Sequence, residues 1–241
     1  GKSFAIGEAG IMVTSDREIY ERAVAFAHYE RYNQDIKSDS VKDFRGLPLG
    51  GYKYRMNQLC SALGRVQLKH YEDRIVQIQG AMNRFWDLLE GVPGIRALRP
   101  PKGSGSTMGG WYAAKGLYDP DALGGLSVTR FAEAVNAEGT TCGVGINKPL
   151  HLHPLLNTCD VYGHGKPTRN AHSTRDLRQP EGSLPVAESI DRHTYTIPWF
   201  KHDRPEIITE HANAFRKVAE HADELLADDP GDPGNIGRWS V

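Results

Sequence analysis

The sequence has little cysteine and almost no net charge in its 241 residues. Its three cysteines, Cys60, Cys142 and Cys159, are odd in number and far apart, which argues against a disulfide framework and predicts a reducing, cytoplasmic location. Lysine and arginine (29) nearly balance aspartate and glutamate (30), so the formal net charge is −1. No global basic field therefore indicates a nucleic-acid partner or an anionic membrane.

Long hydrophobic runs and several common motifs are also missing. No stretch approaches the ~20 apolar residues that a membrane-spanning helix needs. There is no HExxH motif and no CxxC pair, and the glycine-rich segment 102–110 lacks the Lys-Ser/Thr ending of a phosphate-binding P-loop. A hydrophobic content of 39% is that of a globular protein with one large domain or two small ones.

The pattern of apolar residues predicts the helices. Ser15 or Asp16 caps a predicted helix over 17–29, and a three-and-four spacing predicts one long helix, or two joined near His70, over 59–89. The apolar face of that segment consists of Leu59, Leu63, Val66, Ile75, Ile78, Met82, Phe85 and Leu89. Further helices are predicted over 128–137, over 184–191, and from a capping-box start at Asp203 to about Leu225.

Short segments between these helices predict strands over 10–14, 111–118, 140–146 and 194–197. The connection over 30–56 is far longer than usual, and such connections are more often functional or disordered than incidental. A strand–helix–strand–helix order after a long connecting helix predicts a small α/β domain attached to a larger one.

Four motifs carry a family resemblance. The first is Lys2-x-x-x-x-Gly-Glu-Ala-Gly followed by an apolar segment, and the second is Gly-Tyr-Lys-Tyr-Arg-Met over 51–56 leading into a helical segment. The third is Pro-Leu-His over 149–151, and the fourth is Leu-Pro-x-x-Glu over 184–188. In this order they resemble the DegT/StrS-type sugar aminotransferases, and the resemblance covers about residues 1–227.

The resemblance implies an α/β protein of the aspartate-aminotransferase fold. Residues 1–90 would be the end of the large domain that binds pyridoxal 5'-phosphate (PLP), together with the connecting helix, and residues 91–241 the small C-terminal domain. The chain looks like the C-terminal part of such an enzyme, beginning at its Schiff-base lysine. Family members carry most of the sheet and of the cofactor contacts upstream, so the isolated 241 residues are not expected to bind PLP productively.

The activity implied is transfer of an amino group from glutamate or glutamine to a keto-sugar, often nucleotide-linked, or to a cyclitol ketone. Lys2 would form the Schiff base with PLP, and its freed amine would shuttle a proton between substrate and cofactor. In the family, the loop that here holds Lys53, Tyr54 and Arg55 reaches across a homodimer to the partner's cofactor phosphate. Lys53 replaces the family's asparagine, and Arg55 has a purely structural interpretation as well.

The resemblance places Tyr52, His151 and His153 on the substrate side, although His153 has a structural interpretation too. Their segment also holds His164, His172, Cys159 and Asp160, and His-x-His is a spacing that zinc sites use. A His-rich metal-binding domain is thus an alternative, although no metal site is assigned. Four cations, Arg169, Arg175, Arg178 and Lys201, could meet an anionic group or be solvated surface charges.

Two further alternatives share the fold. A sugar-dehydrating relative replaces the lysine with histidine, so Lys2 argues against that activity. A catalytically inactive fragment or paralogue that depends on an active partner is the other, because Lys53 departs from the family pattern.

Overall fold

The computed structural model describes residues 2–28, 32–145, 147–234 and 236–237. The chain divides into two compact units, Gly1–Glu72 and Asp73–Val241. The combination of helices with a small sheet agrees with the α/β class expected from the sequence. The domain boundary near residue 90 stays a prediction.

Two α-helices lie within the described residues of unit 1. Helix α1 (Arg17–Ala27) begins at Asp16, whose carboxylate accepts a hydrogen bond from the Ile19 N–H at 3.1 Å. Helix α2 (Gln58–Lys69) begins in the same way at Asn57. Two short 3-10 helices, η1 (Asn33–Asp35) and η2 (Lys42–Phe44), lie between them. The predicted helix over 17–29 is confirmed as far as Ala27, and Tyr29 lies outside the described residues.

One prediction for unit 1 is wrong. Residues 10–14 are irregular and exposed rather than a strand. A strand needs a second strand to accept its backbone hydrogen bonds, and the described part of this unit contains no strand. The predicted apolar face of α2 is helical but exposed, since Leu59, Leu63 and Val66 are 80%, 47% and 55% exposed.

A buried carboxylate organises the chain after α1. Glu21 is buried, forms an ion pair with Arg17 at 2.6 Å, and accepts the backbone N–H groups of Lys37 and Ser38 at 2.9 and 2.6 Å. The pKa of Glu21 is lowered to about 2, and hydrogen bonds from the side chain and backbone of Ser38 contribute most to this lowering. Because the pKa falls on folding, this carboxylate stabilises the native state above its ordinary pKa of 4.5.

Glu21→Gln is therefore expected to release residues 33–44 at neutral pH, because a neutral amide loses the ion pair and accepts hydrogen bonds weakly. In the unsubstituted chain the same release occurs as pH falls from 4.5 toward 2, where the carboxylate becomes protonated. Amide chemical shifts of Lys37 and Ser38, followed by NMR against pH, measure both effects. Glu72→Gln, at an exposed glutamate of the same unit, is the matched control, and equal shifts in both variants would contradict this role of Glu21.

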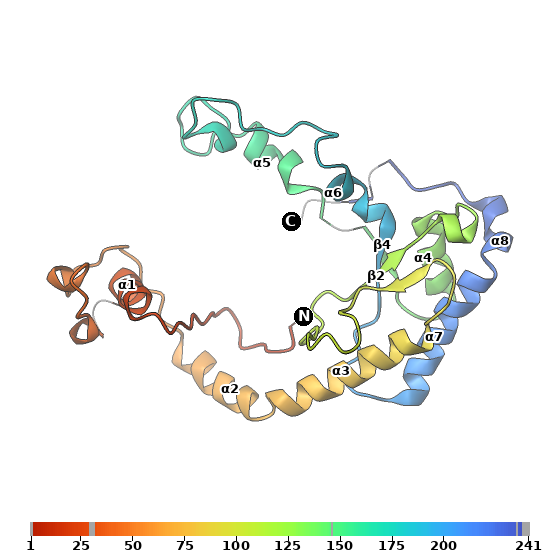
Figure 1. Cartoon of the computed structure of the whole chain (residues 1–241), viewed down its shortest axis with the longest axis horizontal. Coiled ribbons are helices and arrows are strands. Elements are labelled where there is room, and N and C mark those ends of the chain that lie inside the picture. The colour runs from red at the N-terminus through yellow and green to blue at the C-terminus, as the bar shows by residue number, and fades with distance from the viewer. Residues whose placement is uncertain (1, 29–31, 146, 235, 238–241) are drawn as a thin grey trace. The chain divides into compact units, whose positions relative to one another are not determined.

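Unit 2 contains a four-stranded sheet in the order β1-β2-β4-β3, with every neighbouring pair antiparallel (Figure 1). Its strands are β1 (Ile95–Ala97), β2 (Lys115–Tyr118), β3 (Gly143–Val144) and β4 (Thr194–Thr196). Its α-helices are α3 (Tyr71–Leu88), α4 (Val128–Ala137), α5 (Pro154–Asn157), α6 (Pro185–Ser189), α7 (Pro205–Glu220) and α8 (Ala222–Leu225). The first two residues of α3 belong to unit 1. The prediction of two helices joined near His70 is confirmed.

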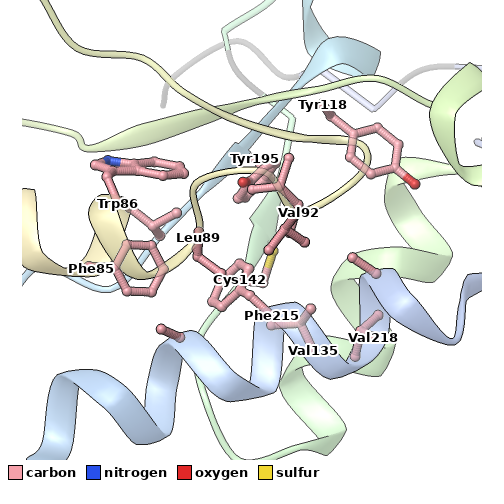
Figure 2. Packing of buried hydrophobic residues seen from close by; sticks show 14 of the residues in the cluster. Phe85, Trp86, Leu89, Val92, Tyr118, Val135, Cys142, Tyr195, Phe215 and Val218 are labelled. Atoms are coloured by element: carbon pink, nitrogen blue, oxygen red, sulfur yellow. The ribbon is translucent and has the colours of Figure 1, made fainter.

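The core of unit 2 lies between the sheet and helices α3, α4 and α7 (Figure 2). Phe85 of α3, Tyr195 of β4 and Phe215 of α7 are fully buried. The ring centroid of Phe215 lies 5.4 Å from that of Phe85 and 5.8 Å from that of Tyr195. Gly116 of β2 lies close to the Tyr195 ring, since a Cβ added at Gly116 would be 2.3 Å from Cζ of Tyr195. Only glycine fits there without displacing the ring.

Three boundaries in unit 2 differ from the predictions. The strand expected over 111–118 begins only at Lys115, because Trp111 and Ala113 have φ angles of 53° and 51° that a strand cannot accommodate. The strand over 140–146 shortens to Gly143–Val144, and Ile146 lies outside the described residues. Asp203 does not cap α7, since its carboxylate pairs with Arg84 at 2.7 Å.

Candidate functional site

Lys2 is exposed at the start of an irregular segment that helix α2 holds in place. Ile6 is buried, and the nearest atoms to a Cβ added at Gly64 of α2 are carbons of its side chain, at 3.7 Å. The Phe4 ring meets the Tyr71 ring edge-on, with centroids 5.5 Å apart, and Gln67 donates to the Ala5 carbonyl at 3.2 Å. The segment is therefore anchored while the Lys2 amine stays accessible to solvent.

The Tyr-Lys-Tyr-Arg segment lies just before α2 in the same unit. The rings of Tyr52 and Tyr54 stack with centroids 5.2 Å apart, and both lie near the Phe26 ring of α1, at 5.5 and 6.4 Å. Lys53 is exposed and Arg55 is half-buried.

An amine and two cations are suited to a particular kind of ligand. A neutral lysine amine attacks a carbonyl carbon, and lysine and arginine bind phosphate oxygens through charge-assisted hydrogen bonds. The exposed Lys2 thus suits a ligand with an aldehyde, and Lys53 and Arg55 suit a phosphate.

In unit 2 the third and fourth motifs meet directly. His151 is buried, and its Nε2 lies 2.9 Å from Oε1 of Glu188. Glu188 also accepts the backbone N–H groups of Gly182 and Leu184, at 2.6 and 2.9 Å. The Leu184 and Gly182 bonds, followed by the smaller effect of His151, lower the pKa of Glu188. The sequence contained both residues but no sign that they form a pair.

His153 has a local structural contact as well. Its Nδ1 accepts the Leu155 N–H at 3.0 Å, which caps the short helix α5. The rings of both predicted substrate-side histidines thus hold parts of unit 2 together, and their contact with a substrate stays a prediction.

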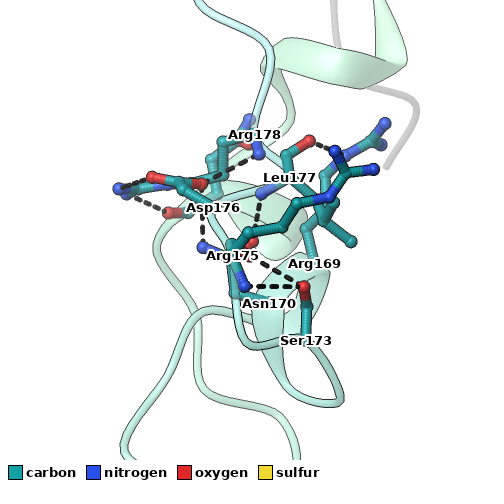
Figure 3. A network of polar contacts seen from close by, with 8 residues as sticks. Arg169, Asn170, Ser173, Arg175, Asp176, Leu177 and Arg178 are labelled. Atoms are coloured by element: carbon teal, nitrogen blue, oxygen red, sulfur yellow. Dashed lines mark hydrogen bonds and ion pairs between the residues drawn. The ribbon is translucent and has the colours of Figure 1, made fainter.

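The chain between α5 and α6, residues 158–184, forms a loop-rich arm that a polar network orders (Figure 3). Asp176 accepts hydrogen bonds from Arg178 and from the Asn170 amide at 2.9 Å, while Asn170 accepts the Leu177 N–H at 2.8 Å. Arg178 contributes most to lowering the pKa of Asp176. Arg169 binds the Leu177 carbonyl at 2.9 Å. Arg169 and Arg178 are therefore structural, which composition could not distinguish from surface charge.

Glu188→Ala is expected to loosen this arm, because it leaves His151 and two backbone N–H groups without their acceptor. Proteolytic cleavage within 158–184 should become faster by roughly tenfold. Time-resolved proteolysis with mass mapping of the cut sites measures the rate. The matched control is Glu181→Ala, an exposed glutamate on the same arm. Equal rates in the two variants would show that the pair does not hold the arm.

Two further results concern other classes of site. Among the described residues, no group of three or more His, Cys, Asp and Glu side chains could hold a metal ion. Over the same part of the chain, no helix combines the length and apolar character needed to cross a membrane.

Comparison with known proteins agrees with the motif order. The model of the DegT/DnrJ/EryC1/StrS aminotransferase family matches residues 1–196. GDP-perosamine synthase of Escherichia coli O157:H7 is 32% identical over 79 residues, which cover 31% of this chain and 18% of that protein. The erythromycin biosynthesis sensory transduction protein EryC1 of Saccharopolyspora erythraea is 23% identical over 194 residues, 80% of this chain and 43% of that protein. The chain thus spans less than half the length of the curated relatives it matches.

A solved structure shows the same fold. An aminotransferase from Psychrobacter cryohalolentis superposes with a TM-score of 0.61 at 19% identity, over 88% of this chain and 51% of that chain.

Proposed function

The chain belongs to the DegT/DnrJ/EryC1/StrS aminotransferase family, and on that premise we propose that it forms part of a PLP-dependent sugar aminotransferase in which Lys2 binds the cofactor. The amino donor is glutamate or glutamine, and the acceptor is a keto-sugar, often nucleotide-linked, or a related cyclitol ketone. The proposal includes a homodimer with shared active sites and a cytoplasmic location.

The observation that carries this proposal is the placement of Lys2. Lys2 is exposed on a segment anchored to α2. The phosphate-binding candidates 53–55 come just before that helix, on the loop that would reach the partner's cofactor in the proposed homodimer. PLP supplies the electron sink for amino transfer when it is bound, so the protein needs few catalytic groups beyond the lysine.

The chain's own residues have distinct parts in this mechanism. The Lys2 amine, in its neutral form, would hold the cofactor and then accept and return a proton at the reacting substrate carbon. Lys53, Tyr54 and Arg55 hold the phosphate, with Lys53 acting as a point charge where the family has asparagine. Tyr52, His151 and His153 orient the substrate.

Borohydride reduction of the purified protein, followed by peptide mass mapping, tests the proposal. A pyridoxyl group on Lys2 is the expected result. The isolated 241-residue chain is compared with the same chain supplied with an upstream large-domain segment of a relative. No label on Lys2 in either sample would contradict the proposal, and amino transfer by the isolated chain unaided would show that the expectation of incompleteness is wrong.

A further inference from the structure

Beyond the short 3-10 helix η7 (Leu226–Asp228), the chain crosses unit 2 as a tail without regular secondary structure. The first part of this tail holds the start of helix α4 through two carboxylates. Asp229 accepts the backbone N–H and the hydroxyl of Ser127, at 2.7 and 2.6 Å. Asp232 accepts the same two groups of Thr129, at 3.0 and 2.7 Å. Because the N-terminus of a helix carries unpaired N–H groups and a partial positive charge, both carboxylates stabilise α4 where they bind it.

Ser127 links the tail to the helix itself. Its hydroxyl oxygen caps α4 by accepting the Arg130 N–H at 3.1 Å, while the hydroxyl donates its own hydrogen to Asp229. Burial alone would raise the pKa of Asp229, but the hydrogen bonds from Ser127 outweigh burial and hold that pKa below its usual value. The carboxylate is therefore charged at neutral pH, which is the form that accepts both hydrogen bonds.

A later part of the tail packs against the edge of the sheet. Strand β3 is the outer strand of the order β1-β2-β4-β3, and Gly145 follows it directly. A Cβ added at Gly145 would lie 2.5 Å from the carbonyl oxygen of Ile236 and 3.1 Å from its Cγ2. Ile236 is half-buried, and its side chain packs against the core of unit 2. The tail therefore lies so close to the end of the edge strand that no side chain fits between them.

The last described residue of the tail reaches the base of the arm. Gly237 is buried, and its N–H donates to the Asp191 carboxylate at 3.2 Å. Asp191 belongs to the 3-10 helix η6 (Ile190–His193), which directly follows α6. Helix α6 carries Glu188, which holds His151 and two backbone N–H groups of the arm. The tail, which in Figure 1 runs from α8 back toward α6, thus connects the start of α4 with the point where the arm returns to the sheet.

We propose that this tail, residues 229–234 with 236 and 237, is a strap that couples the start of α4 to the base of the arm. While the strap is closed, α6 and η6 are held in place and the arm keeps its order. When the strap opens, α6 and η6 loosen although the core of unit 2 stays folded. The strap opens separately because carboxylate hydrogen bonds and one half-buried side chain hold it, whereas buried rings from the helices and the sheet hold the core. It lies beyond residues 1–196, which the family model matches, and the inference does not depend on the proposed function.

Hydrogen exchange followed by mass spectrometry on the full 241-residue chain tests this coupling. Asp229→Ala combined with Asp232→Ala removes the contacts with α4. This double variant is expected to speed amide exchange about tenfold in residues 127–131 and also in residues 185–193, at the other end of the strap. Exchange in α7, which belongs to the core, should stay unchanged. The matched control is Asp228→Ala, at the exposed aspartate directly before the strap, which should change neither region.

A second variant acts at the far end of the strap and tests the coupling even if the double variant fails to fold. Ile236→Ala keeps both carboxylates and should speed exchange in residues 185–193 by about threefold or more. Unchanged exchange there in Ile236→Ala, or faster exchange confined to 127–131 in the double variant, would overturn the inference, because the tail would then only cap α4. Equally faster exchange in α7 would overturn it as well, because the tail would then be part of the core. The measurement needs neither PLP nor turnover, so its outcome is separate from the labelling of Lys2.

Discussion

Replacing Lys2 with arginine is expected to lower the rate of amino transfer by at least about a thousandfold and to abolish the borohydride label. Arginine keeps the positive charge, but its guanidinium stays protonated at any relevant pH. It therefore cannot attack an aldehyde or accept a proton from a substrate carbon. The half-reaction with glutamate or glutamine measures the rate; it is carried out on the chain supplied with an upstream large-domain segment and followed through the absorbance of bound cofactor.

Lys69→Arg is the matched control for this substitution. Lys69 is an exposed lysine in the last turn of α2, in the same unit as Lys2. We expect Lys69→Arg to keep both label and rate. Both variants should fold normally because both lysines are exposed. A Lys2→Arg protein with more than about a tenth of the original rate would show that another group performs the proton transfer.

Phe215→Ala in α7 is expected to lower the free energy of unfolding of unit 2 by about 3–5 kcal/mol. Phe215 is fully buried, and its ring lies within 6.3 Å of those of Phe85, Phe131 and Tyr195, centroid to centroid. Removing it takes away apolar surface burial and leaves a cavity between the sheet and two helices. Urea denaturation followed by tryptophan fluorescence measures the change, because Trp86, Trp111 and Trp199 all belong to unit 2.

Ile207→Ala on the same helix is the control, since Ile207 is 42% exposed and should cost less than about 1 kcal/mol. A similar loss in both variants would mean that helix propensity rather than core packing governs the stability of α7. A loss below about 1 kcal/mol for Phe215→Ala would mean that the neighbouring rings close the cavity.

Part of the candidate site could be proposed from the sequence because the signals for it are local. The family resemblance of two short motifs singled out Lys2 and the segment 52–55, and the family match covers both, while their roles stay predictions. The pairing of His151 with Glu188 could not be predicted, because 37 residues separate them and the contact depends on how the arm returns to its base. For the same reason Arg169 and Arg178 resembled surface charges until their partners on the arm were known.

Helices α1, α4 and α7 and the break between α2 and α3 could be read from the sequence, because capping residues and a 3.6-residue apolar period act over a few positions. The tertiary structure decided which apolar faces became core. Ile78 and Phe85 of α3 meet the sheet and are buried, whereas Leu59 and Val66 of α2 follow the same period and remain exposed. It also decided strand length, since strands form only where another backbone accepts their hydrogen bonds: β4 pairs with β2 and β3, and residues 10–14 have no such neighbour in the described part of unit 1.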